Sequence, residues 1–266
     1  PEDYASAHSH KKEVAQAGYY SVYLSRYKVN AELTVSYRCA HHRHTFSTSK
    51  DNHIVMNLSR TNSVRPGNAR WTFEKVDDHA FCGSQNGMYF YAVASRPIKG
   101  VRTLKNTRER FTLIDFEDGE RVVELQIGFS YTSIEKAKLN LEREILGKSF
   151  DEVRRSADQQ WEMRLSKIRV SGGTELQKSL FYSGMYRVLQ NPNLRSDVDA
   201  ADEATIYSSN NYWDTYANKL VLLQMLEPEL VSQIIRSEIQ RAERSGFLAS
   251  GFHGDFSTAF ITGSYL

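Results

Sequence analysis

The sequence predicts a protein of two parts, an antiparallel β-sandwich followed by an α-helical domain. Before Tyr131, short segments rich in Val, Ile, Tyr, Phe and Thr alternate polar and apolar residues, as half-buried strands do. After Ser133, apolar residues recur every three or four positions, which is the period of an amphipathic helix. The 266 residues, of which 40% are hydrophobic and 25% charged, are enough to bury a sizeable core.

The β part contains at least six expected strands, separated by the turn sequences RPGN, SQNG and EDGE. Several short strands in series are typical of a β-sandwich. The expected strands are GYYSVYLS, AELTVSYRCA, HIVMNLS, GMYFYAVAS, RFTLIDF and RVVELQIGFSY.

Helical periodicity begins after the last strand. One apolar stripe runs from Phe150 to Ile168. Ser149, just before it, and Glu152, three residues later, have the spacing of a capping box. A second helix is expected from Leu176 and ends at the helix-breaking pair Asn191-Pro192.

A third helix is predicted from Pro228 to Gly246, because Pro favours a helix start and Gly favours the position just after a helix end. The C-terminal DFSTAFITGSYL predicts a further helix capped by Asp255. The change of period predicts a β-sandwich over 1–131, incomplete at its start, then linker helices over 132–171, and then a helical array over 172–266.

The charge balance and apolar runs exclude some classes of partner. The net charge is +2, from 34 basic and 32 acidic residues, whereas phosphate binding needs a concentrated basic face. No apolar run approaches the roughly 20 residues of a membrane span. The chain opens on Pro1 with no signal-peptide pattern, so we expect a processed protein or a fragment. Cys39 and Cys82 are interpreted as small buried apolar residues, with a disulfide as the alternative.

The sequence HHRH, His41 to His44, resembles a metal cluster. On a strand, His42 and His44 share one face whereas His41 faces the other way. No Cys or carboxylate with recognisable ligand spacing lies nearby. A polar strand at a sheet edge is therefore the favoured interpretation.

Three other polar stretches are interpreted as structural. Asp77, Asp78 and His79 are expected in a loop. SDVD, Ser196 to Asp199, offers two carboxylates for calcium but lacks the EF-hand pattern, so a turn is favoured. SGG, Ser171 to Gly173, is expected to be a linker.

The stretch NNYWDTYANKL points more clearly to chemistry. Trp213 offers a flat apolar face for the C–H side of a sugar ring, and Asp214 offers a carboxylate that grips hydroxyl groups through charge-assisted hydrogen bonds. A packing Trp beside an N-capping Asp explains the same pair. Composition alone leaves both interpretations open.

Longer segments carry a family resemblance. VVELQIGFSYTSIEKAKLNLEREI, SFDEVRRSADQQWEMRLSKIRVSGGTELQKSLFYSGMYRVLQNPNLRSDVD, WDTYANKLVLLQMLEPELV and SGFLASGFHGDFSTAFITGSYL closely resemble glycoside hydrolase family 92. The resemblance runs from about Gly18 to Leu266 and is strongest from Val122 onward. It implies a mostly bacterial, calcium-dependent, inverting exo-α-mannosidase, with a β-sandwich, a helical linker and an (α/α)6 barrel.

The resemblance also assigns residues. Trp213 and Asp214 match a Trp-Asp-Thr motif at a barrel-helix start, where the Asp holds mannose hydroxyls. His253 and Asp255 match a segment near the same rim and are expected to contribute to substrate binding. The short Trp-Asp motif is also similar to that of trehalases, so it does not fix the substrate by itself.

The chain departs from the family pattern after this motif. Ala217, Leu220 and Val221 stand where the family often carries Arg and then His-Pro. The sequence AADEATIYSSNN replaces a stretch rich in Gly and Arg, and a loop between GFLASG and FHGD is short or missing. Either altered specificity or omitted loops explains these departures.

The length predicts an incomplete barrel. Twelve helices with their connections need roughly 200 residues, whereas about 95 follow Ser171. We therefore expect the general acid Glu, the general base Asp and most calcium ligands outside this chain. No catalytic residue and no metal ligand is assigned within it. The missing barrel half is expected from the rest of the chain or from another chain.

The expected function is hydrolysis of terminal α-mannosidic bonds in glycans, of the α-1,2 type, at a secreted, periplasmic or cell-surface location. The expected partner is a mannose-containing glycan. Neither a nucleic-acid partner nor a membrane span is expected. Two alternatives remain, a non-catalytic glycan-binding protein and a different (α/α)6 hydrolase such as a trehalase.

Overall fold

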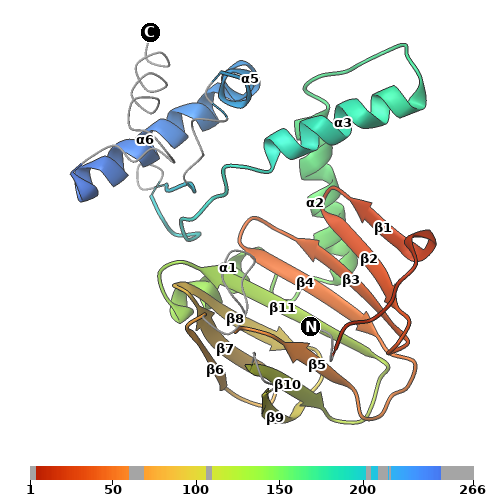
Figure 1. Cartoon of the computed structure of the whole chain (residues 1–266). Coiled ribbons are helices and arrows are strands. Elements are labelled where there is room, and N and C mark those ends of the chain that lie inside the picture. Colours follow the sequence, from red (N-terminus) through yellow and green to blue (C-terminus); the bar gives the residue numbers. More distant parts are fainter. Residues whose placement is uncertain are drawn as a thin grey trace. The chain divides into compact units, whose positions relative to one another are not determined.

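The computed structural model describes residues 4–59, 69–105, 110–201, 205–208, 215 and 217–246 (Figure 1). The chain divides into two compact units, Pro1–Trp161 and Glu162–Leu266. This division does not decide the predicted domain limits at residues 131 and 171, which stay predictions.

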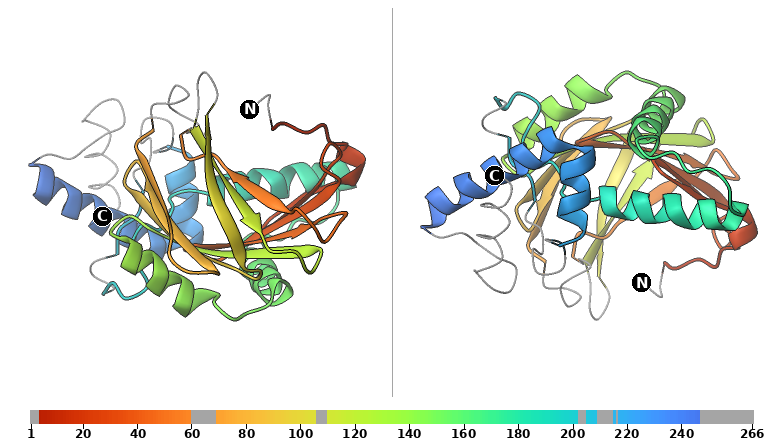
Figure 2. Two further views of the ribbon diagram at one scale, coloured as in Figure 1. Left: turned by 90° about the horizontal axis from the view of Figure 1, so that it is seen from below. Right: turned by 90° about the horizontal axis from the view of Figure 1, so that it is seen from above.

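The first unit contains two antiparallel sheets (Figures 1 and 2). The large sheet has eight strands in the order β1-β2-β3-β4-β11-β8-β7-β6, and the small sheet has three in the order β5-β10-β9. A short 3-10 helix, His10–Lys12, precedes the first strand. The strands are β1 (Glu13–Gln16), β2 (Tyr19–Leu24), β3 (Val29–Val35), β4 (Cys39–Thr45), β5 (His53–Met56), β6 (Trp71–Lys75), β7 (Ala80–Gln85), β8 (Met88–Ala94), β9 (Ile98–Lys105), β10 (Arg110–Phe116) and β11 (Val122–Ser130).

Apolar side chains of the two sheets meet in one core. Alternation along β11 places Val123, Leu125 and Ile127 on its inner face, each at most 5% exposed. They belong to the same buried cluster as Ile114 and Phe116 of β10 in the small sheet. Two sheets that share a buried interior confirm the predicted sandwich.

Helix α1 (Ile134–Glu144) covers the outer face of β11 and β8. A Cβ added at Gly128 would lie 2.2 Å from the carbonyl oxygen of Ala137, so only glycine allows this close approach. The Asn140 side chain donates a 2.7 Å hydrogen bond to the carbonyl of Phe129. The helix and β11 therefore form one tightly packed layer.

Helix α2 (Phe150–Leu165) begins with the predicted capping box. The Ser149 N–H donates to Glu152 Oε2 at 2.8 Å, and the Glu152 N–H donates to Ser149 Oγ at 3.3 Å. The Phe150 side chain is 1% exposed, and its ring centroid lies 5.3 Å from that of His41. The first turn of the helix is thus anchored on the large sheet.

The second unit is helical. Its described helices are α3 (Glu175–Leu189), α5 (Lys219–Leu226) and α6 (Pro228–Ser245). Gly246 ends α6 with a left-handed φ of 81°, which glycine adopts without strain. The predicted helices before Asn191-Pro192 and between Pro228 and Gly246 are confirmed.

Beyond β11 the described residues form helices, turns and one isolated β-bridge, between Leu194 and Tyr207. The predicted change from strands to helices near Tyr131 is therefore confirmed for this part of the chain. Where residues are described, no helix combines the length and the apolar character that crossing a membrane requires.

The strand prediction was wrong at AELTVSYRCA, which the structure divides into the end of β3 and the start of β4. The Ser36 N–H donates to the Cys39 carbonyl at 2.9 Å across a tight turn. The turn sequence Ser-Tyr-Arg contains no Gly, Pro, Asn or Asp, and Ser36 alone is a weak turn signal. Strands β1, β6, β7 and β9 were not predicted either.

Both cysteines are free and buried. Cys39 and Cys82 belong to one apolar cluster with Tyr91 and Leu141. Burial raises the pKa of the Cys39 thiol to about 12. The interpretation of both residues as small buried apolar groups is confirmed.

Candidate functional site

The four residues predicted to bind sugar lie outside the part of the chain that the structure describes. These are Trp213, Asp214, His253 and Asp255. Their roles, and the helix capped by Asp255, stay predictions. The described residues on either side of Trp213 and Asp214 define the frame to which this motif is attached.

The segments 193–195 and 206–208 pair as an antiparallel ribbon ahead of the motif. The Ser208 N–H donates to the Asn193 carbonyl at 2.7 Å, and the Asn193 N–H donates to Ser208 Oγ at 2.9 Å. The chain therefore enters the stretch that carries Asp214 from a fixed position.

Polar side chains of α6 hold this ribbon in place. The Tyr207 N–H donates to Ser237 Oγ at 3.0 Å, and the Tyr207 hydroxyl donates to Gln233 Oε1 at 2.8 Å. Ser237 is fully buried, and Glu238 beside it is 3% exposed and paired with Arg241. Sequence reasoning missed this buried polar row on α6.

Helix α5 follows the motif. Its N-cap residue Asn218 accepts a hydrogen bond from the Lys219 N–H through its side chain. Leu220 and Leu223 are buried, as is Ile234 of the neighbouring α6. Burial lowers the pKa of Lys219. Both ends of the motif-bearing stretch are thus tied to α6, one through the ribbon and the other through α5.

The SDVD stretch forms a turn, as predicted. The Ala200 N–H donates to the Asp197 carbonyl at 3.1 Å, and Asp197 is 7% exposed. Calcium takes six to eight oxygen ligands. In the described part of the second unit, no three His, Cys, Asp or Glu side chains converge as a metal site.

The HHRH stretch lies inside the large sheet and not at its edge, because β4 pairs with β3 on one side and β11 on the other. His41 is 1% exposed, and its Nε2 lies 3.2 Å from Glu124 Oε2. His42 and His44 share the opposite face, as predicted, with ring centroids 5.9 Å apart. The predicted edge position was wrong because the local sequence does not reveal which strands pair.

The paired histidines are half-buried and behave as neutral groups. Burial lowers the pKa of His42 and that of His44 to about 4 each. No third ligand joins them among the described residues.

The predicted loop at Asp77 to His79 is confirmed. The Asp77 carboxylate accepts hydrogen bonds from the N–H groups of His79 and Ala80, each at 2.7 Å. These bonds lower the pKa of Asp77. The cluster closes the turn between β6 and β7.

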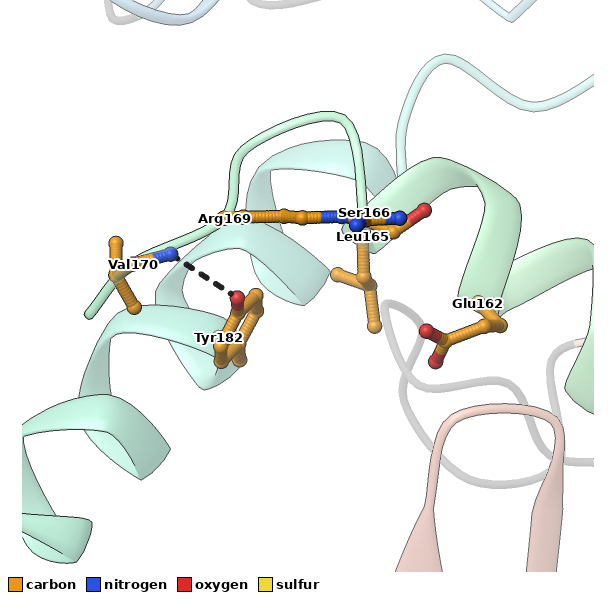
Figure 3. A pocket seen from close by; sticks show the side chains of 6 residues that line it. All are labelled: Glu162, Leu165, Ser166, Arg169, Val170 and Tyr182. Carbon is orange, nitrogen blue, oxygen red and sulfur yellow. Dashed lines mark hydrogen bonds between the residues drawn. The ribbon is translucent and has the colours of Figure 1, made fainter.

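An open hollow of about 480 Å³ lies beside the linker between α2 and α3 (Figure 3). The Tyr182 hydroxyl donates to the Ile168 carbonyl at 3.2 Å and accepts from the Val170 N–H at 3.4 Å. The described residues that line the hollow are Glu162, Leu165, Ser166, Arg169, Val170 and Tyr182. Through these two hydrogen bonds Tyr182 stabilises the linker.

An antiparallel sandwich followed by a helical domain is an architecture of two-domain glycoside hydrolases. Comparison with protein families supports this class. The glycosyl hydrolase family 92 N-terminal domain matches residues 1–141, and the family 92 catalytic domain matches residues 136–265. The chain therefore belongs to glycosyl hydrolase family 92. A comparison with curated proteins gives no match.

Solved structures with the same fold include two Bacteroides thetaiotaomicron proteins. The family GH92 α-mannosidase BT3965 is 22% identical with a TM-score of 0.79, over 90% of this chain and 37% of that one. The inverting mannosidase BT2199 is 21% identical with a TM-score of 0.83, over 98% and 40%. The GH92 glycosyl hydrolase ccman5 is 20% identical with a TM-score of 0.80, over 100% and 45%.

These likenesses confirm the predicted fold class, a β-sandwich followed by helices of an (α/α)6 barrel. The chain spans 37% to 45% of the length of the three structures.

Proposed function

We propose that this chain is part of an exo-acting α-mannosidase that removes terminal mannose from glycans with inversion at the anomeric carbon. The observation that carries the proposal is the continuous match to both family 92 domains, over residues 1–141 and 136–265. One similar structure belongs to an inverting mannosidase, and BT3965 was also solved with mannoimidazole bound. Shared family membership supports the same chemistry here.

In this proposal Trp213 and Asp214 bind the terminal sugar. The indole covers the apolar face of the ring, and the carboxylate accepts hydrogen bonds from its hydroxyl groups. Both groups bind and orient mannose and neither transfers a proton. The ribbon, which Tyr207 bonds to α6, and the start of α5 would set the position of the motif.

The general acid and base are proposed to lie outside the 266 residues. An inverting glycosidase needs two carboxyl groups about 6.5–9.5 Å apart, and the acid among them needs a raised pKa. Hydrogen bonds to the ionised form instead lower the pKa of five described carboxyl groups. These groups are Glu13, Glu32, Asp77, Glu135 and Glu152.

Calcium dependence is proposed on the same family basis. A bound calcium ion would orient and polarise sugar hydroxyl groups. No three His, Cys, Asp or Glu side chains converge among the described residues of the second unit, and we place most of the calcium ligands outside this chain. The α-1,2 linkage and a secreted, periplasmic or cell-surface location also remain proposals, supported by the resemblance alone.

The proposal is tested on the intact protein with calcium present. We expect hydrolysis of aryl α-mannosides and of α-1,2-mannobiose, with β-mannose as the first anomer seen by NMR. Preferred hydrolysis of trehalose would replace this proposal with another (α/α)6 hydrolase. Glycan binding without hydrolysis of any of these substrates would identify a non-catalytic binding protein.

A further inference from the structure

Two histidines and one glutamate converge at the beginning of β1, far along the chain from the motif proposed to bind sugar. His8 Nε2 lies 4.0 Å from Glu13 Oε2, and His10 Nδ1 lies 2.5 Å from the same oxygen. The three potential ligand atoms all lie within 4.8 Å of one another. Where residues are described, this is the only such group of three or more His, Cys, Asp or Glu side chains.

We propose that His8, His10 and Glu13 form a binding site for a divalent transition-metal ion, with Zn²⁺ as the best fit. Zinc accepts imidazole nitrogen and carboxylate oxygen at about 2.0–2.2 Å in a tetrahedral arrangement. Ligand atoms in that arrangement are roughly 3.4 Å apart. The two distances to Glu13 Oε2, 4.0 Å and 2.5 Å, lie on either side of this value. Side-chain movements of about 1 Å therefore suffice, and a fourth position stays open for water.

Backbone hydrogen bonds fix the segment that carries the two histidines. The Ser25 N–H at the end of β2 donates to the Ala7 carbonyl at 3.1 Å, next to His8. The Lys12 N–H donates to the Ser9 carbonyl at 2.8 Å and closes the short 3-10 helix. The histidines at positions 8 and 10 are therefore presented by ordered backbone on both sides.

Tyr20 orients the carboxylate. Its hydroxyl donates a 2.7 Å hydrogen bond to Oε1 of Glu13, which leaves Oε2 for the two histidines. The register of the β1–β2 pair, with Ala15 opposite Tyr20, brings the phenol to this position. An outer hydrogen bond of this kind is a common feature of metal sites and contributes to their affinity.

An ordinary surface ion pair explains only part of this arrangement. A pair between His10 and Glu13, three residues apart, accounts for the 2.5 Å contact. It does not account for the second imidazole, because His8 directs its Nε2 at the same carboxylate oxygen and its ring meets that of His10 edge-on at 5.3 Å. Convergence of two imidazoles on one oxygen favours a cation with nitrogen and oxygen ligands.

The test is titration of zinc chloride into the tag-free intact protein, by calorimetry, in a buffer that contains calcium. Calcium prefers oxygen ligands and should not compete at this site. We expect one equivalent of zinc to bind with a Kd below about 100 µM. His8→Ala or Glu13→Gln should weaken it at least about tenfold, whereas His53→Ala, which changes an exposed histidine of β5, should not.

A second pair of variants tests the outer hydrogen bond. Tyr20→Phe should weaken zinc binding about tenfold, the lower end of the range for such partners. Tyr23→Phe, on the same strand, should leave it unchanged. Circular dichroism at the titration temperature confirms that each variant is folded. The proposal is overturned if the wild type binds no zinc at 100 µM, or if His8→Ala and Glu13→Gln retain the wild-type Kd and stoichiometry.

Discussion

The backbone N–H of Tyr207 donates a 3.0 Å hydrogen bond to the hydroxyl oxygen of Ser237, which is fully buried in α6. Tyr207 belongs to the ribbon that leads into the Trp213-Asp214 motif. One buried hydroxyl on a helix therefore fixes the strand-like segment that precedes the Trp213-Asp214 motif in the sequence.

Ser237→Ala should lower the free energy of unfolding by about 1 kcal/mol, because it removes a buried hydrogen-bond acceptor. Ser232→Ala, on an exposed position of the same helix, should change it by less than about 0.5 kcal/mol. Urea unfolding of the intact protein measures both. Equal stability of the two variants would show that the Tyr207 contact contributes nothing.

Gly128→Ala should destabilise the sandwich by about 3 kcal/mol or prevent folding. The added methyl group would lie 2.2 Å from the Ala137 carbonyl oxygen, so α1 would have to move away from β11. Gly100→Ala in β9 is the control, because nothing lies within 4 Å of its added methyl group. If both variants melt at the same temperature as the wild type, the close approach of α1 to β11 does not require glycine at position 128.

Stability should fall as the pH is lowered from about 6.5 to about 4, in part because of His42 and His44. Their folded-state pKa values are depressed to about 4, so in this range the unfolded chain binds more protons. Each histidine can contribute a slope of up to about 1.4 kcal/mol per pH unit. The stabilising effect is complete above pH 6.5.

The variant with both His42→Gln and His44→Gln should lose this part of the slope. Urea unfolding at pH 7.5, 6 and 5 compares it with the wild type, and slopes from carboxyl groups cancel in the comparison. The same slope in both proteins would mean that the two histidines take up protons in the folded state.

The 266-residue chain expressed alone should not hydrolyse α-mannosides, even with calcium. The reason is that it spans 37% to 45% of the similar structures, and we place the acid and base outside it. Leu176, Leu180 and Met225 are each at least 65% exposed, so the chain should also self-associate in light scattering. Calcium-dependent turnover by a monodisperse monomer would show that the catalytic carboxyl groups are misplaced in our account.

Sequence patterns predicted elements whose signals are local. The apolar stripe from Phe150, the caps at Ser149 and Gly246 and the alternation on β11 each depend on residues a few positions apart. The central position of HHRH depends on pairing with β11 as well as with the neighbouring β3, and β11 is distant in sequence. Strand β9 was missed because five of its eight residues are exposed, so that its apolar alternation is weak.

The candidate site was predictable only in part. The motif residues Trp213 and Asp214 are visible from their chemistry, and the family resemblance gave them a role. The polar residues Ser237 and Glu238 look like the solvent face of a helix in the sequence. They are buried because the ribbon and Arg241 cover them, which is a tertiary contact that local periodicity does not report.

The most direct test of the central claim is kcat/KM of the intact protein for an aryl α-mannoside, measured for the wild type and for Asp214→Ala. We predict calcium-dependent hydrolysis by the wild type and a loss of at least about tenfold in the variant, or roughly 1.4 kcal/mol of transition-state binding. Asp78→Ala, which removes an exposed carboxylate paired with Lys75, should retain full activity. Full activity of Asp214→Ala would contradict the proposed sugar site, and no mannoside hydrolysis by the wild type would contradict the proposed function.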